Sequence, residues 1–487
     1  MLFNSFEYLL AFLPVTFVIY FLLNRWRVTK AGTAWLVLAS LFFYSWWNVK
    51  YLALISCSIL VNFGVGSALG RTGREHAAAG SRKSILLFGI LFNVLLLGYY
   101  KYTDFFIANL NALAGWNLAV QKIVLPLGIS FFTFTQIAYL VDAYRGDARE
   151  YDFLNYALFV TFFPHLLAGP IIHHKEMMPQ FASRWNKVLN YKNLSLGLFL
   201  LIIGLFKKVI IADELLPVAT AGFDTVKSLT LIEAWVTSVS YTFQLYFDFS
   251  AYTDMALGTA LLFNIKLPIN FNSPYKALDI ADFWRRWHIT LSRFLRDYIY
   301  IPMGGNRKGR FRTYLNVMAT FLVGGLWHGA GWTFVFWGFL HGAGTAIHRY
   351  WSTLNLRMPR VLAWFLTFNF VNIAWVFFRA KTWADAMKVL RGMAGLSGVM
   401  FSQDLAAKLG FLQKYGVSFG TPFFKYVHHN VWILLAVLMV FLLTSRNSNE
   451  AVASFKPTRN ALALTAALAI YTLLNMNKVT EFLYFNF

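Results

Sequence analysis

The sequence has little of what a soluble or disulfide-stabilised protein needs. Its 487 residues include a single cysteine, Cys57, which excludes an internal disulfide and any zinc site built from several cysteines. Charged residues make up only 13% of the chain, about half of their share in ordinary soluble domains. This shortage excludes a soluble globular enzyme, because too few charges are present to cover a hydrated surface.

The chain is instead rich in apolar and aromatic residues. Hydrophobic residues make up 58% of the sequence and aromatic residues 19%, and the mean hydropathy is +0.54. Basic residues outnumber acidic ones by 43 to 21, a net charge of +22, and they cluster between apolar runs. Such clusters are typical of loops on the cytoplasmic side of a membrane. We therefore expect an all-α polytopic protein whose partner is the lipid bilayer, and no nucleic-acid partner.

Apolar runs of the length needed to cross a bilayer recur along the whole chain. The first run has neither a basic segment before it nor a small-residue cleavage site after it, so we expect a membrane span and not a removed signal peptide. We predict about eleven transmembrane helices plus re-entrant or interfacial helices, from candidate runs at 6–24, 33–47, 51–69, 84–100, 156–172, 194–211, 232–249, 314–327, 332–347, 361–378, 431–444 and 461–474.

The basic clusters also predict an orientation. Loops at 25–30, 71–83 and 446–459 carry several lysines and arginines each, which places them in the cytoplasm. Both termini are then expected on the exterior side. Residues 379–430 form a long stretch without a span, and we expect this loop to be exterior too. Its length fits either a docking surface or a passive connector.

Polar residues inside apolar segments are informative, because each is costly in a membrane unless protein surrounds it. Four stretches have this character: Pro126–Gln136, Phe162–Pro170, the segment YFDFSAYTDMALG with Asp248 and Asp254, and Asn270–Arg307. The absence of an internal repeat argues against a transporter built from paired halves. A transporter or channel nevertheless stays open as an alternative from these residues alone.

The fourth stretch has too many charges to cross hydrocarbon. Read as a helix, it gathers Phe283, Trp287, Phe294 and Tyr298 broadly on one side. Two interpretations follow: an interfacial helix with its arginines on lipid phosphates, or a receptor for an anionic cytosolic donor such as an acyl thioester. The arginines concerned are Arg285, Arg286, Arg293 and Arg296.

His328 lies between two apolar runs in the segment LWHGAGW, where glycines would let a ligand approach the backbone. A neutral imidazole there could accept the proton of a hydroxyl nucleophile, although a packed, hydrogen-bonded histidine is an equal alternative. We expect five further histidines to be packed residues without a catalytic role: His165, His173, His174, His341 and His348. Adjacent residues seldom share a ligand face, so His173 and His174 do not predict a metal site.

The ordered set PLGISFFTFTQ, FFPHLLAGPI, FDFSAYTDMALG, FNSPYKALDIADFWRRWHITLSRFLRDYIYIPMGGNR and LWHGAGWTFVFWG resembles the membrane-bound O-acyltransferase family. The similar branch is the bacterial one, with alginate O-acetylation and lipoteichoic-acid D-alanyl transfer proteins. The resemblance runs from about Pro126 to Phe378. It implies one domain over 1–487, with spans at 1–125, a motif core at 126–378, an exterior loop at 379–430 and closing spans at 431–487.

The resemblance also implies a ring of helices around a thin passage and roles for named residues. The defining histidine of the family corresponds to His328, and its second active-site position to His288, 40 residues earlier. Donor or substrate contacts are expected from the four arginines together with Asp248 and Trp327. The family implies a cytosolic donor, here acetyl-CoA, and neither a metal nor a bound cofactor.

The last six residues read F-x-Y-x-x-F and include Tyr484. They resemble a terminal motif that carries an acyl-accepting tyrosine in the D-alanyl system, so Tyr484 is a candidate acyl relay. An aromatic anchor at the membrane interface is the alternative.

Together these features predict an acyltransferase in the inner membrane of a bacterium. His328 and His288 would pass an acetyl group to Tyr484, and a periplasmic serine-esterase-like partner would move it to a polysaccharide such as alginate. Direct transfer to a sugar hydroxyl and a non-catalytic role in polysaccharide export are the alternatives. The sequence does not distinguish alginate from cellulose or peptidoglycan as the polymer.

Overall fold

The computed structural model describes residues 1–72, 79–150, 152–476 and 480–483. Nearly all of the regular structure in these residues is helical, as the sequence predicts. The described part contains one small sheet, in which β1 (Val399–Ser402) and β2 (Val417–Gly420) pair in parallel with Val399 opposite Val417.

The chain folds into two compact units. Unit 1 comprises Met1–Leu205, Ala251–Asn270 and Val452–Phe487, and unit 2 comprises Phe206–Ser250 and Phe271–Ala451. Three helices pass from one unit into the other along the chain: α10 (Tyr191–Phe206), α12 (Leu231–Leu262) and α22 (Ser448–Ala453).

Unit 1 holds most of the N-terminal helices and the last one. Its α-helices are α1 (Leu13–Arg25), α2 (Thr29–Ser45), α3 (Lys50–Thr72), α4 (Ala79–Leu97), α5 (Thr103–Ala114), α6 (Ile129–Arg145), α7 (Phe153–Thr161), α8 (Phe163–Leu166), α9 (His174–Ala182) and α23 (Arg459–Leu474). Short π-helical or 3-10 segments occur at Glu7–Phe12, Gly98–Tyr102 and Trp185–Lys187.

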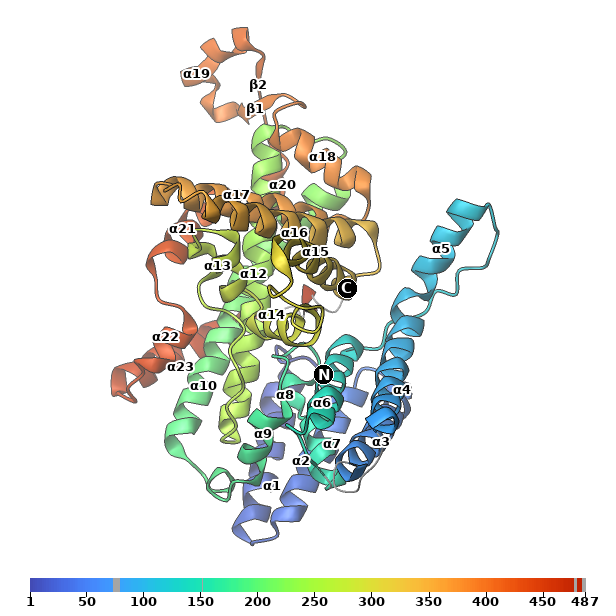
Figure 1. Cartoon of the computed structure of the whole chain (residues 1–487). Coiled ribbons are helices and arrows are strands. Elements are labelled where there is room, and N and C mark those ends of the chain that lie inside the picture. Colours follow the sequence, from blue (N-terminus) through green and yellow to red (C-terminus); the bar gives the residue numbers. More distant parts are fainter. Residues whose placement is uncertain (73–78, 151, 477–479, 484–487) are drawn as a thin grey trace. The chain divides into compact units, whose positions relative to one another are not determined.

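Unit 2 contains His288, His328 and the four candidate arginines, and Figure 1 labels the helices α13, α14 and α15 in this part of the chain. Its α-helices are α11 (Asp213–Thr220), α13 (Ile280–Arg286), α14 (Ile289–Leu295), α15 (Gly309–His328), α16 (Trp332–Thr353), α17 (Arg360–Arg379), α18 (Trp383–Met393), α19 (Ala406–Leu409), α20 (Phe424–Val427) and α21 (Val431–Thr444). π-Helical or 3-10 segments occur at Lys207–Ala212, Ala221–Thr225, Pro274–Lys276, Arg296–Tyr300, Gln403–Leu405 and Gly410–Tyr415.

Several helices suit a membrane. Within the described residues, five are long and apolar enough to cross one: Glu7–Arg25, Lys50–Arg71, Ser81–Ala114, Tyr191–Thr225 and Arg360–Arg379. Two shorter apolar helices, α21 and α23, coincide closely with predicted spans. The protein is therefore a multi-helical membrane protein, while the count of about eleven crossings stays a prediction.

The prediction of one apolar face assumed that the arginine-rich stretch is a single continuous helix. The structure shows two helices instead. α13 ends at Arg286, and α14 begins at Ile289. Between them His288 has a left-handed backbone, with φ of 43°, which an α-helix of L-residues does not accommodate. The segment therefore changes direction at His288.

Candidate active site

His288 is held at the turn between α13 and α14. Asp279 caps α13 by accepting a 2.7 Å hydrogen bond from the amide of Asp282, and the carbonyl of His288 accepts one of 3.0 Å from the amide of Ser292. The His288 side chain is fully buried. Its ring meets Phe249 of α12 edge to face, with centroids 4.8 Å apart. The turn thus points this imidazole into the interior of unit 2.

His328 is the last residue of α15 and is also buried. Gly329 and Gly331 continue in extended backbone before α16 begins at Trp332. α15 and α16 pack closely, because a Cβ added to Gly338 would lie 2.5 Å from the carbonyl oxygen of Phe321. Gly338 therefore lets α15 and α16 approach each other near His328.

The structure brings the two histidines together. The ring centroids of His288 and His328 are 6.3 Å apart, and Trp327 lies 6.0 Å from the first and 4.9 Å from the second. Trp337 and Phe378 each lie 5.1 Å from His328. The pair is thus enclosed by aromatic rings from α12, α15, α16 and α17, which leave both imidazoles almost without contact with solvent.

Burial affects the protonation of His288. It lies in the turn between two short helices, and desolvation lowers its pKa to about 3. At neutral pH the ring is uncharged, so it offers one nitrogen that accepts a hydrogen bond and one that donates. Such a ring can orient or relay a proton.

Asp248 directly precedes Phe249 on α12, and its carboxylate forms an ion pair with the buried ammonium group of Lys208. Lys208 Nζ lies 2.7 Å from Asp248 Oδ1 and 3.0 Å from Asp213 Oδ1. The side chains of Lys208 and Asp248 are each only 2% exposed. Asp248 is therefore an ion-pair partner one residue away from the ring that contacts His288.

The arginines differ in their surroundings. Arg285 and Arg286 both pair with Asp282, at 3.3 and 2.8 Å. Arg296 pairs with Asp297 at 2.7 Å, and this hydrogen bond raises the pKa of the Arg296 guanidinium. The side chains of Arg285 and Arg296 are 65% and 61% exposed, so they can still reach a ligand in solvent. Arg293, on α14, is partly buried.

Sequence reasoning did not identify the aromatic enclosure or Lys208. Phe249, Trp337 and Phe378 look like ordinary apolar helix positions, and Lys208 stands 40 residues before its partner Asp248. His341, expected to be a packed residue, accepts a 3.2 Å hydrogen bond from the indole N–H of Trp284. In unit 1, His173 and His174 approach different carboxylates, those of Asp142 and Glu150. Among the described residues, no three His, Cys, Asp or Glu are grouped as metal ligands.

The C-terminal tail is described as far as Leu483, so Tyr484 lies outside the described residues. Before it, Phe482 is buried, and its ring lies 4.6 Å from that of Tyr252 in unit 1. The Tyr252 oxygen accepts a 3.2 Å hydrogen bond from the amide of Ala168. The carbonyl of Thr480 accepts one of 3.1 Å from Asn4. The tail is therefore packed against the N-terminal segment and α12.

The apolar helices are those of a membrane protein, and the two histidines lie together in its interior. The chain belongs to the membrane-bound O-acyltransferase family, whose model matches residues 41–382. The resemblance found in the motifs is thereby confirmed, and so is the enzyme class.

Relatives support the same branch. A peptidoglycan O-acetyltransferase of Helicobacter pylori is 46% identical over this whole chain and 98% of its own length. A probable alginate O-acetylase, AlgI, of Pseudomonas aeruginosa is 40% identical over 85% of this chain and 78% of its own. A teichoic acid D-alanyltransferase of Streptococcus thermophilus is 27% identical over 53% of this chain and 69% of its own.

Proposed function

We propose that this enzyme transfers an acetyl group from cytosolic acetyl-CoA, at the His288–His328 pair, toward a polysaccharide outside the cytoplasmic membrane. One observation carries the proposal: the two imidazoles are buried 6.3 Å apart in an enclosure of aromatic rings. Acyl transfer between two oxygen or sulfur atoms needs a base, a proton relay and exclusion of water, and this arrangement can supply all three.

In the proposed step, His328 accepts the proton of an acceptor hydroxyl as that oxygen attacks the thioester carbonyl. The carbon–sulfur bond then breaks, and the imidazolium returns the proton to the departing thiolate. An ester forms, a thioester is consumed, and no oxidant or reductant is needed. His288 orients the carbonyl or relays the proton. Trp327, next to both rings, covers the site.

The acceptor hydroxyl in this proposal is that of Tyr484. A free phenol with a pKa near 10 is a weak nucleophile at neutral pH, so it needs the base. Within unit 1, Phe482 of the tail packs against Tyr252. The acyl-tyrosine would face the exterior, where a serine-esterase-like partner moves the group to the polymer. Peptidoglycan is the first polymer to test, since the relative named for it matches the whole chain.

The remaining predicted residues have supporting roles in this proposal. Arg285 and Arg296 contact the phosphates of the donor, with Arg286 and Arg293 beside them. Asp248 acts through its ion pair with Lys208, which fixes the turn of α12 that carries Phe249. The helices form a ring around a passage in the bacterial inner membrane, with both termini outside, and residues 1–487 act as a single domain.

The test is labelling of purified protein in detergent with radiolabelled acetyl-CoA. Wild type is compared with His328→Ala and Tyr484→Phe, and with the control variants His341→Gln and Tyr426→Phe. His341 is buried among the same rings, 4.7 Å from Trp337, and Tyr426 is exposed. Removing a general base should lower the rate of labelling by about 10²–10⁴-fold.

The outcomes separate the steps of the proposal. Label on wild type and both controls, lost in both test variants and mapped to the C-terminal peptide, supports the tyrosine relay. Label that survives Tyr484→Phe but not His328→Ala keeps the acyltransferase and removes Tyr484 from the mechanism, because another residue then carries the acetyl group. Label that survives His328→Ala at the wild-type rate contradicts the proposed base.

A further inference from the structure

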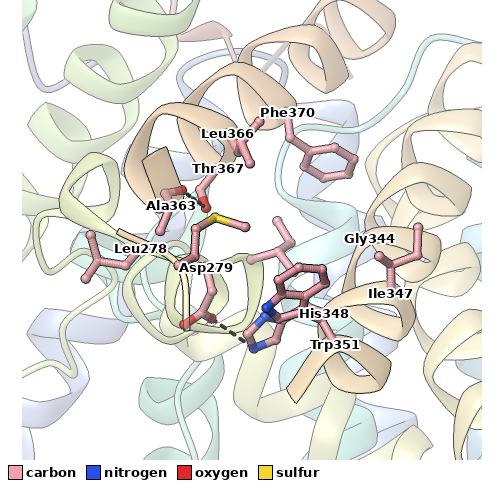
Figure 2. Close-up of a pocket in the computed structure, with 12 residues that line it drawn as sticks. Leu278, Asp279, Gly344, Ile347, His348, Trp351, Ala363, Leu366, Thr367 and Phe370 are labelled. Atoms are coloured by element: carbon pink, nitrogen blue, oxygen red, sulfur yellow. Dashed lines mark hydrogen bonds and ion pairs between the residues drawn. The ribbon is translucent and has the colours of Figure 1, made fainter. Parts of the chain in front are cut away.

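A pocket of unit 2 is formed by α16, α17, the loop between them and residues 278–280 at the start of α13 (Figure 2). Its volume is about 390 Å³, within the range of sites that bind small molecules or single chains. Ile347 and Trp351 contribute from α16, and Leu366 and Phe370 from α17. The lining is largely apolar, so the pocket suits a hydrocarbon ligand.

Two features shape the pocket. A Cβ added to Gly344 would lie 2.7 Å from the ring of Phe370, so the glycine lets α16 and α17 approach each other there. His348 Nε2 lies 3.5 Å from Asp279 Oδ1, and Figure 2 shows this ion pair beside the indole of Trp351. An apolar cavity with the polar pair His348–Asp279 in its wall suits an amphiphile, a molecule with an apolar chain and a polar head.

The position of the pocket along α17 matches one leaflet of a bilayer. α17 is among the helices able to cross a membrane, and it begins at Arg360. The residues that it contributes run from Ala363 to Phe370. At 1.5 Å per residue these lie about 5–15 Å from the start of the span, the depth of one leaflet of acyl chains.

The adjoining loop is basic. The segment from His348 to Arg360 contains Arg349, Arg357 and Arg360 but no acidic residue. Arg357 and Arg360 are exposed and flank Met358, which lines the pocket. Basic loops of this kind face the cytoplasm, whose leaflet carries anionic lipids. The charge of the loop and the depth of the pocket therefore both favour an anionic lipid of the cytoplasmic leaflet as the ligand.

We propose that this pocket binds one acyl chain of an anionic phospholipid of the cytoplasmic leaflet, with its phosphate held by Arg357 and Arg360. The chain fills the apolar space between α16 and α17. The proposal is independent of the acyl-transfer mechanism, because the pocket includes neither His288 nor His328 nor the aromatic rings that enclose them.

The test uses phosphatidylglycerol with a photoreactive diazirine in mid-chain, in vesicles that hold the full-length protein. Phosphatidylcholine with the same diazirine is the comparison lipid. Crosslinked peptides are mapped for wild type, for Ala363→Phe, which fills the pocket, and for its neighbour Leu362→Phe, which does not line it. The double variant Arg357→Gln/Arg360→Gln changes only exposed side chains. It therefore still tests the proposal if Ala363→Phe folds poorly.

We expect phosphatidylglycerol to label residues 344–370 preferentially over phosphatidylcholine. Each arginine removed should lower this preference about fivefold. Ala363→Phe should abolish the labelling at 344–370, and Leu362→Phe should leave it unchanged. Equal labelling by the two lipids, or labelling that Ala363→Phe does not reduce, would mean bulk lipid only and would overturn the proposal. Competition by acetyl-CoA would assign the pocket to the donor and would overturn it as well.

Discussion

Lys208 Nζ lies 2.7 Å from Asp248 Oδ1, and both side chains are almost completely buried. Lys208 stands in the π-helical segment Lys207–Ala212, and Asp248 lies near the middle of α12. Asp213 approaches the same ammonium group at 3.0 Å, with a side chain that is 16% exposed. The ion pair thus joins two segments of unit 2 next to Phe249.

The first prediction concerns the removal of one partner. Lys208→Met leaves Asp248 as an uncompensated buried charge, so it should lower the free energy of unfolding by about 3–5 kcal/mol. Adding Asp248→Leu removes that charge and should restore most of the loss. Thermal melting of the detergent-solubilised protein measures both. Lys207→Met is the matched control, and a double variant no more stable than Lys208→Met contradicts the prediction.

The second prediction concerns the glycines around His328. A Cβ on Gly325 would clash with the carbonyl oxygen of Phe334, whereas a Cβ on Gly331 would lie 3.6 Å from the Phe334 ring, an ordinary contact. Gly325→Ala should therefore separate α15 from α16, lower the free energy of unfolding by about 1–3 kcal/mol and reduce acetyl transfer. Gly331→Ala should change neither.

Melting temperature and initial rate are measured on the same preparations. Equal effects of the two substitutions would show that the close approach of α15 and α16 does not determine the position of His328.

Much of the helical structure could be predicted from hydrophobicity. The predicted span 361–378 is α17, Arg360–Arg379, and the span 431–444 has the bounds of α21. Other boundaries failed for physical reasons. The run 156–172 is divided into α7 and α8 because the backbone leaves the helical region at Phe162. α12 continues past the predicted end at 249 to Leu262, because its buried polar side chains are surrounded by protein.

The site was predictable only in part. The motif resemblance selected His288 and His328, and the structure places their rings near each other. Their surroundings depend on contacts between segments far apart in sequence, such as Phe249 with His288 and Phe378 with His328. No local pattern distinguishes these phenylalanines from the other aromatic residues of the spans. The left-handed backbone at His288 could not be read from helical periodicity either.

The third prediction separates the backbone role of His288 from its chemistry. Its φ of 43° is tolerated by glycine and asparagine but strains a β-branched residue by about 1–2 kcal/mol or more. His288→Asn should therefore keep the turn but transfer acetyl slowly, and His288→Gly should keep the turn at a cost in stability from the cavity it leaves. His288→Val should also lower the melting temperature. If His288→Asn keeps the wild-type rate, the imidazole is not needed for transfer.

The fourth prediction concerns the exposed arginines. Arg285→Gln and Arg296→Gln each remove a cation that would contact donor phosphates, while His288 and His328 remain in place. We expect KM for acetyl-CoA to rise up to about tenfold for each, with kcat unchanged, because the lost contact is present in ground state and transition state alike. Initial rates over a range of donor concentrations separate the two constants.

Arg391→Gln on α18 is the control for a general loss of positive charge, since this arginine is exposed and lies in the segment 379–430. Added salt should raise KM for wild type more than for the two test variants, because ions screen the contacts that the variants already lack. A fall in kcat at unchanged KM would contradict phosphate binding. It would instead indicate that the ion pairs of these arginines with Asp282 and Asp297 hold α13 and the segment after α14 in place.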